Sequence, residues 1–123
     1  MTLADTSVWV DFFRGTTTAN TLGDLLETNE ILLHPWVLGE LVLGGLGPQR
    51  EAVIADLRRL PTAPCVPDDD VLELVVVRHL WGRGIGWVDV HLLASALVTG
   101  CRLWTFDRSL AAAAEDIDLG TAP

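Results

Sequence analysis

Hydrophobic and polar positions along the chain predict strands and helices in alternation. Continuous apolar runs over residues 3–4, 30–34 and 102–106 are typical of short strands buried on both faces, as parallel strands are. Weaker strand patterns lie near residues 65–66 and 117–119. Apolar residues spaced three and four apart predict helices over residues 6–13, 21–28, 36–43, 48–60, 68–81, 87–97 and 108–114. This order favours an α/β fold with a parallel sheet of about five strands, covered by helices on both faces.

The size and hydropathy of the chain fit one globular domain spanning residues 1–123. Half of the residues are apolar, which excludes a disordered chain. The longest apolar runs, around residues 31–33 and 71–77, are too short or too interrupted to span a bilayer. No basic region precedes an apolar segment at the N-terminus, so we expect no signal peptide and a cytoplasmic protein without membrane contact.

The charge composition limits the possible chemistry. There are 17 acidic and 8 basic residues, a net charge of −9, and every basic residue is arginine. The lack of lysine excludes Walker-type phosphate binding and Schiff-base catalysis. A conventional nucleic-acid binder should carry a basic face, which this composition does not favour. Bound cations would invert the local potential at an acidic site, and Arg14 and Arg108 are candidates for its rim.

Four acidic residues lie at positions where their side chains could form a ligand-binding site. Asp5 and Asp107 each follow a predicted strand, and ligands bind at the carboxyl ends of parallel strands. Glu40 is the only charge in a helix that is otherwise apolar, where an unpaired buried carboxylate is costly. Asp89 lies in the first turn of another apolar helix. Four carboxylates without a lysine suggest a pocket for divalent cations, and a solvated face for Glu40 or simple capping by Asp89 remain alternatives.

Other conspicuous residues have simpler interpretations. Thr6 or Ser7 is expected to cap the first helix, whose apolar residues Val8, Trp9, Phe12 and Phe13 are expected to pack in the core. The three acids at residues 68–70 suit the first turn of a helix, where they complement its dipole. The histidines at positions 34, 79 and 91 form no zinc-ligand pattern, so we interpret them as structural.

The ordered set of motifs resembles a known family. The segments Leu-Ala-Asp5-Thr-Ser, Gly39-Glu40-Leu, Val88-Asp89 and Trp-Thr105-Phe-Asp107 together are similar to the motifs of PIN domains. The length resembles that of VapC toxins from bacterial VapBC toxin–antitoxin modules. Gly86-Trp87 departs from the pattern, because a Ser, Thr or Pro often opens the corresponding helix in the family.

The resemblance implies a ribonuclease that requires Mg²⁺ or Mn²⁺ and cuts tRNA or rRNA to halt translation. Asp5 and Asp89 would be the principal metal ligands and Glu40 and Asp107 would complete the catalytic pocket, with supporting hydroxyls from Thr6 or Ser7 and from Thr105. It also implies a cognate VapB-type antitoxin, commonly with an arginine that reaches the same carboxylates, and a homodimer.

Such a pocket has a clear chemical use. Hydrolysis of a phosphodiester needs an activated water and stabilisation of charge on the phosphate oxygens, and carboxylate-bound Mg²⁺ supplies both. A phosphoacceptor domain of receiver type also has clustered acids, but it needs a lysine, and a dehalogenase-like phosphatase needs a lysine and an Asp-x-Asp motif. The alternatives are a PIN-like fold that binds partners without catalysis and, less favoured for want of a lysine, the phosphoacceptor domain.

Overall fold

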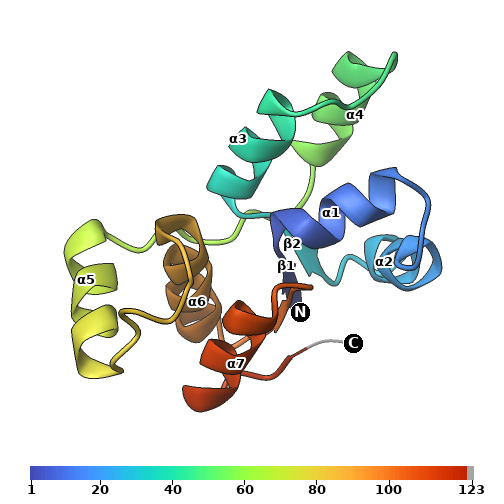
Figure 1. The fold of residues 1–123 in the computed structure, drawn as a ribbon. Helices are drawn as coiled ribbons and strands as arrows, with labels where there is room; N and C mark the ends of the chain where they lie inside the picture. Colours follow the sequence, from blue (N-terminus) through green and yellow to red (C-terminus); the bar gives the residue numbers. More distant parts are fainter. Residues whose placement is uncertain (122–123) are drawn as a thin grey trace.

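A computed structural model describes residues 1–121 and has a three-stranded parallel sheet at its centre (Figure 1). The strand order is β2-β1-β3, with β1 at Thr2–Ala4, β2 at Ile31–Leu32 and β3 at Arg102–Trp104. Thr2 pairs with Ile31 on one side and with Arg102 on the other. The first strand of the chain is therefore the central strand, and the predicted parallel α/β sheet is confirmed.

The sheet is narrower than the expected five strands. Beyond the three strands, only single bridges were found in residues 1–121, from Leu33 to Thr62 and from Leu103 to Thr121. No strand was found at residues 65–66, and the nearest pairing is the bridge at Thr62, which follows Pro61, a residue with no N–H to donate. The edge strand expected at residues 117–119 is a turn instead, in which Asp118 has a φ of 61°.

Seven helices were found in the described residues, matching the predicted ones apart from their ends. They are α1 (Thr6–Phe13), α2 (Ala19–Glu27), α3 (Pro35–Leu43), α4 (Arg50–Leu57), α5 (Asp68–Val77), α6 (Trp87–Thr99) and α7 (Arg108–Asp116). Helix α5 ends at Val77, four residues early, and His79 just beyond it has a φ of 55°. Helix α6 continues to Thr99, where Gly100 takes the left-handed conformation that ends many helices. The three acids at residues 68–70 lie in the first turn of α5, as expected.

The helices surround the short sheet. In Figure 1, α1 and α2 lie on one side of β1 and β2, α5 and α6 lie on the other, and α3 and α4 extend above them. A single apolar core, which includes fully buried Leu3, Val8, Leu93, Leu103 and Leu110, joins the strands to the helices. Among the described residues, no helix is both long enough and apolar enough to cross a membrane. The carboxyl ends of β1 and β3 lead directly into α1 and α7, and this junction carries the site.

Candidate functional site

Asp5 joins the end of β1 to the start of α1. Its side chain accepts a hydrogen bond from the Val8 amide at 3.1 Å, so Asp5 itself is the N-cap of α1. The expectation that Thr6 or Ser7 caps this helix was wrong, because both residues already lie within its first turn. Asp5 is only 5% exposed. A buried carboxylate needs strong partners, and its neighbours provide them.

Two hydroxyl groups hold the Asp5 carboxylate. Ser7 donates to Oδ1 at 2.5 Å, and the Thr105 hydroxyl donates to Oδ2 from the end of β3. The Ser7 oxygen also accepts the amide of Phe106 at 3.1 Å. Together with the Val8 amide, these donors fill three of the roughly four acceptor positions of a carboxylate. Asp5 is therefore fixed in orientation with one position left for an external ligand.

Asp107 is the N-cap of α7, just as Asp5 is the N-cap of α1. Its Oδ1 atom accepts the amides of Ser109 at 2.8 Å and Leu110 at 3.2 Å. Its own amide donates to the Thr105 hydroxyl at 3.0 Å, and that hydroxyl donates to Asp5. One threonine thus fixes the spacing between the two acids that follow β1 and β3.

Glu40 lies on α3 and is linked to α1 by Thr6. The Thr6 hydroxyl donates to Oε1 of Glu40 at 2.6 Å. The sequence suggested that α3 leaves little room for a solvent-facing side, but Trp36, Glu40 and Leu43 are all exposed on this helix. Glu40 is therefore solvated and bonded to a hydroxyl, and it is not buried in apolar surroundings.

Asp89 lies in the third position of α6. Its Oδ2 atom accepts the amide of Gly86 at 3.1 Å, which closes the first turn of the helix. Partial burial, and then the negative charges of Asp107, Asp5 and Glu40, raise the pKa of Asp89 above its ordinary value. The backbone hydrogen bond opposes this increase. Asp89 therefore lies near enough to each of the other three acids for their charges to act on it.

The remaining carboxylate oxygens are available to a ligand. In residues 1–121, no protein hydrogen bond was found to Oε2 of Glu40, Oδ1 of Asp89 or Oδ2 of Asp107. Nor do three or more acidic, histidine or cysteine side chains of this part of the chain form a group close enough to hold a metal ion by themselves. Since Mg²⁺ usually keeps several waters and takes only one or two carboxylates, the donor set nevertheless fits a hydrated divalent cation.

Two buried histidines belong to the helices that carry Glu40 and Asp89: His34 is the N-cap of α3, and His91 lies in the second turn of α6. His34 caps α3, where its Nδ1 accepts the Trp36 amide at 3.0 Å, and the Trp36 ring lies 4.2 Å from the His91 ring. Burial, and then the nearby His91, lower the pKa of His34 to about 4. The Nε2 atom of His34 has no hydrogen-bond partner among residues 1–121. Both histidines are structural, as the sequence suggested.

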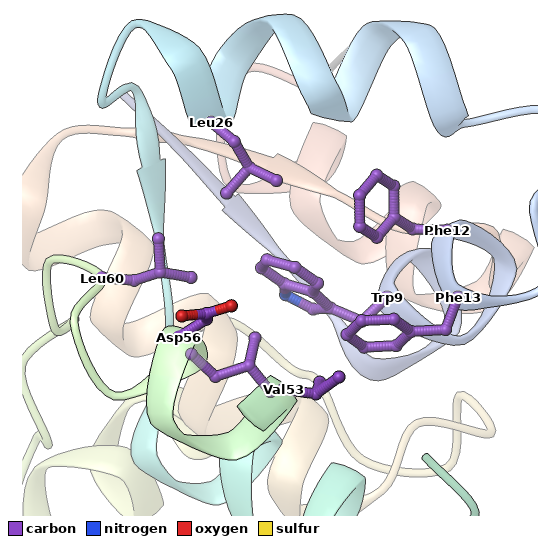
Figure 2. A pocket seen from close by; sticks show the side chains of 8 residues that line it. Trp9, Phe12, Phe13, Leu26, Val53, Asp56 and Leu60 are labelled. Atoms are coloured by element: carbon purple, nitrogen blue, oxygen red, sulfur yellow. The ribbon is translucent and has the colours of Figure 1, made fainter. Parts of the chain in front are cut away.

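An apolar groove lies between α1, α2 and α4, and its lining includes none of Asp5, Glu40, Asp89 and Asp107 (Figure 2). It has a volume of about 220 Å³, and Trp9 lies in its middle with Phe12, Phe13, Leu26, Val53, Asp56, Leu57 and Leu60 around it. The sequence placed Phe12 and Phe13 in the core, but Phe13 is 37% exposed and Phe12 is only partly buried. The exposure of Phe13 had no local signal in the sequence, because the adjacent Val8 and Trp9 of the same helix are both buried.

Comparisons with known proteins agree with this architecture. The PIN domain family profile matches residues 2–116. Ribonuclease VapC32, from two strains of Mycobacterium tuberculosis, is 46% identical over 99% of this chain and 97% of its own.

Solved structures share the fold at low sequence identity. FitAcB from Neisseria gonorrhoeae superposes with a TM-score of 0.68 and 20% identity, covering 100% of this chain and 97% of the other. VapC20 of M. tuberculosis, described as a toxin that cleaves the sarcin–ricin loop, gives 0.65 and 23% over 92% of this chain and 95% of its own. The chain belongs to the PIN domain family and, within it, to the VapC-type ribonucleases.

Proposed function

We propose that this protein is a divalent-metal-dependent endoribonuclease that acts as the toxin of a type II toxin–antitoxin system. Its cofactor would be Mg²⁺ or Mn²⁺, and its substrate would be tRNA or rRNA in the cytoplasm. The main support is the arrangement of Asp5, Glu40, Asp89 and Asp107, which come from four separate elements. Burial, and then the negative charges of the other three acids, raise the pKa of Asp89. VapC32 is named a ribonuclease, and VapC20 is described as a toxin that cleaves the sarcin–ricin loop. Both descriptions support the same activity.

Each residue has a separate task in this proposal. Asp5 and Asp89 hold the metal, and Glu40 and Asp107 complete the acidic pocket with their free oxygens. Ser7 and Thr105 keep the Asp5 carboxylate in one orientation, and Thr6 does the same for Glu40. The bound cation would supply an activated water and stabilise charge on the phosphate. With carboxylates, hydroxyls and a metal in these roles, the chain needs no lysine or histidine for catalysis.

A bound metal would also explain how an acidic nuclease can bind negatively charged RNA. Without a cation, the four carboxylates repel one another and would repel a phosphate. A bound divalent ion reverses the potential at this one place, although the chain has a net charge of −9. RNA binding by this protein should therefore depend on the metal more strongly than binding by a basic nuclease does.

The partner in this proposal is a VapB-type antitoxin. An apolar segment of the antitoxin would occupy the groove of Figure 2, where Trp9 has a buried indole N–H with no acceptor among residues 1–121. An arginine of the same partner would reach the carboxylates, whose free oxygens suit a guanidinium group. We also propose a homodimer, because α5 and the loop after it leave Val76 and Trp81 more than half exposed.

The decisive experiment is cleavage of total RNA by the purified protein. We expect cleavage with Mg²⁺ or Mn²⁺, none with a chelator, and none by Asp5→Asn, in which the amide can still cap α1. RNA that stays intact with metal, while the protein still binds its antitoxin, would favour the alternative of a catalytically silent binding module.

A further inference from the structure

A second hollow lies beside Glu40, and of its lining residues only Phe13 also lines the groove of Figure 2. It has a volume of about 310 Å³ and lies between the C-terminal turn of α1, the end of α3 and the loop at residues 44–46. Val10, Phe13 and Leu46 provide apolar surface, and Arg14 and Glu40 provide opposite charges. Its volume is at the lower end of the range for small-molecule pockets.

The wall of this hollow is held in place by the chain itself. Arg50 of α4 donates hydrogen bonds to the carbonyl of Val42 at 2.5 Å and to that of Gly44 at 3.3 Å. These contacts fix the end of α3 and the loop that follows. The hollow is therefore formed before any ligand enters.

Arg14 is the free cation of the hollow. Its side chain is exposed, and within residues 1–121 no carboxylate lies close enough to form an ion pair with it. Arg59 and Arg83 are paired with acids and Arg50 is engaged by carbonyl groups, whereas Arg78, like Arg14, forms no ion pair within residues 1–121. A guanidinium group binds phosphate well, and here it shares a hollow with one of the four acids of the proposed metal site.

We propose that this hollow is a nucleotide subsite for the RNA strand next to the scissile phosphate. This inference rests on the proposed ribonuclease function. Arg14 binds a phosphate, and a base lies against Val10 and Phe13. The side chain of Phe13 is 37% exposed, which leaves an aromatic surface for stacking. Arg14 would attract an RNA phosphate and repel a guanidinium group of an antitoxin, whereas Glu40 in the same hollow has the opposite preference. A cation bound at Glu40 would remove that opposition, so the hollow favours RNA in the metal-loaded protein.

The test is binding of a fluorescein-labelled 12-nucleotide oligoadenylate, measured by fluorescence anisotropy with Ca²⁺ in place of Mg²⁺ and at several salt concentrations. We expect Arg14→Ala to weaken binding about tenfold and to reduce the salt slope by roughly 0.7, the value for one lost phosphate contact on a single strand. Arg14→Lys should retain most of that slope. Phe13→Ala should weaken binding of the oligoadenylate but not of an abasic oligomer of the same length.

Arg78→Ala is the matched control. Arg78 is exposed and ends α5 as Arg14 ends α1, so both variants lose one charge at a helix C-terminus. Equal effects of the two variants on affinity and salt slope would overturn the subsite. If Arg14→Ala instead weakens only the antitoxin complex, the hollow belongs to the protein partner and the proposal is wrong.

The failure of the subsite can be distinguished from the failure of the proposed function. If the wild type cleaves RNA with metal but Arg14→Ala behaves like Arg78→Ala, only the subsite is rejected. If the wild type neither binds the oligomer nor cleaves RNA with metal, both proposals are rejected. Melting curves with and without Mg²⁺ should show the same metal-dependent increase for Arg14→Ala as for the wild type.

Discussion

The hydroxyl of Thr105 donates a hydrogen bond to the carboxylate of Asp5, although 100 residues separate them in the chain. This contact joins the ends of β1 and β3, and the same hydroxyl accepts the amide of Asp107. Thr105 thereby sets the orientation of one acid and the position of another. Partners of this kind typically change metal affinity or activity without touching the metal.

Replacement of Thr105 by valine should reduce RNA cleavage about 10- to 100-fold, because valine keeps the shape of the side chain but cannot hold Asp5. Thr105→Ser is the control, since it keeps the hydroxyl. Initial rates at saturating Mg²⁺, and the Mg²⁺ concentration for half-maximal rate, would measure the effect. Valine and serine variants with equal rates would show that the hydroxyl has no positioning role.

Asp89→Asn should stabilise the fold without metal and should reduce the stabilisation that Mg²⁺ provides. Burial and the neighbouring acids raise the pKa of Asp89 in the folded state, so its ionised form destabilises the fold above the unfolded-state pKa. The asparagine variant should therefore melt at a higher temperature in chelator. It should also lose more than half of the stabilisation by Mg²⁺, which is about 2.7 kcal/mol at one hundred times the dissociation constant.

Asp69→Asn is the matched control for this measurement, because Asp69 also lies in the first turn of an α-helix. Its metal-dependent increase in melting temperature should equal that of the wild type. A metal response of Asp89→Asn as large as that of the control would remove Asp89 from the metal site.

The buried His34 should make the protein less stable in mild acid. Its pKa is lowered from 6.5 to about 4 in the folded state, so the folded protein prefers the neutral ring. The folded protein therefore has its full stability above pH 6.5, where the ring is neutral in both states, and loses stability as the pH falls towards 4. The loss amounts to about 3 kcal/mol, since one pKa unit corresponds to about 1.4 kcal/mol.

Urea unfolding at pH 7 and pH 4 would measure this contribution. Asn at position 34 can still cap α3 but does not titrate, so His34→Asn should lose about 3 kcal/mol less than the wild type over this interval. Parallel pH profiles for the two proteins would contradict the assignment, because other titrating groups are common to both.

A negative charge in the groove of Figure 2 should weaken the antitoxin complex. Val53→Glu places a charge among apolar side chains and next to Asp56, so we expect at least about a tenfold loss of affinity. Val98→Glu, at an exposed apolar position on α6, is the control. Titration calorimetry would measure the affinity, and RNA cleavage by Val53→Glu should be unchanged. Wild-type affinity in Val53→Glu would place the antitoxin elsewhere.

The sequence predicted well those features that depend on local pattern. Apolar runs followed by single acids placed Asp5 and Asp107 at the ends of β1 and β3, and the helical spacing placed Asp89 in a first turn. Details set by backbone chemistry were harder to predict. The prolines around Thr62 and the left-handed Asp118 shortened the sheet, and these effects interrupt a hydrophobic pattern only slightly.

Tertiary contacts could not be predicted from spacing. Nothing in the local pattern indicates that Thr105 bonds to Asp5 or that Thr6 bonds to Glu40, because periodicity defines the face of an element and not its partner. The exposure of Phe13 likewise depends on where α2 and α4 lie relative to α1. Both surfaces outside the acidic pocket were therefore visible only in three dimensions.

The central position of β1 has a consequence for the folding of the protein during its synthesis. Asp5 is among the first residues to be synthesised, but its hydrogen-bond partner Thr105 follows 100 positions later. At bacterial translation speeds this interval is about 5 to 20 s. During that time the nascent chain has no β3 to pair with β1, and Asp5 lacks the hydroxyl of Thr105. The set of four acids is therefore incomplete until Asp107, which follows β3, has been synthesised.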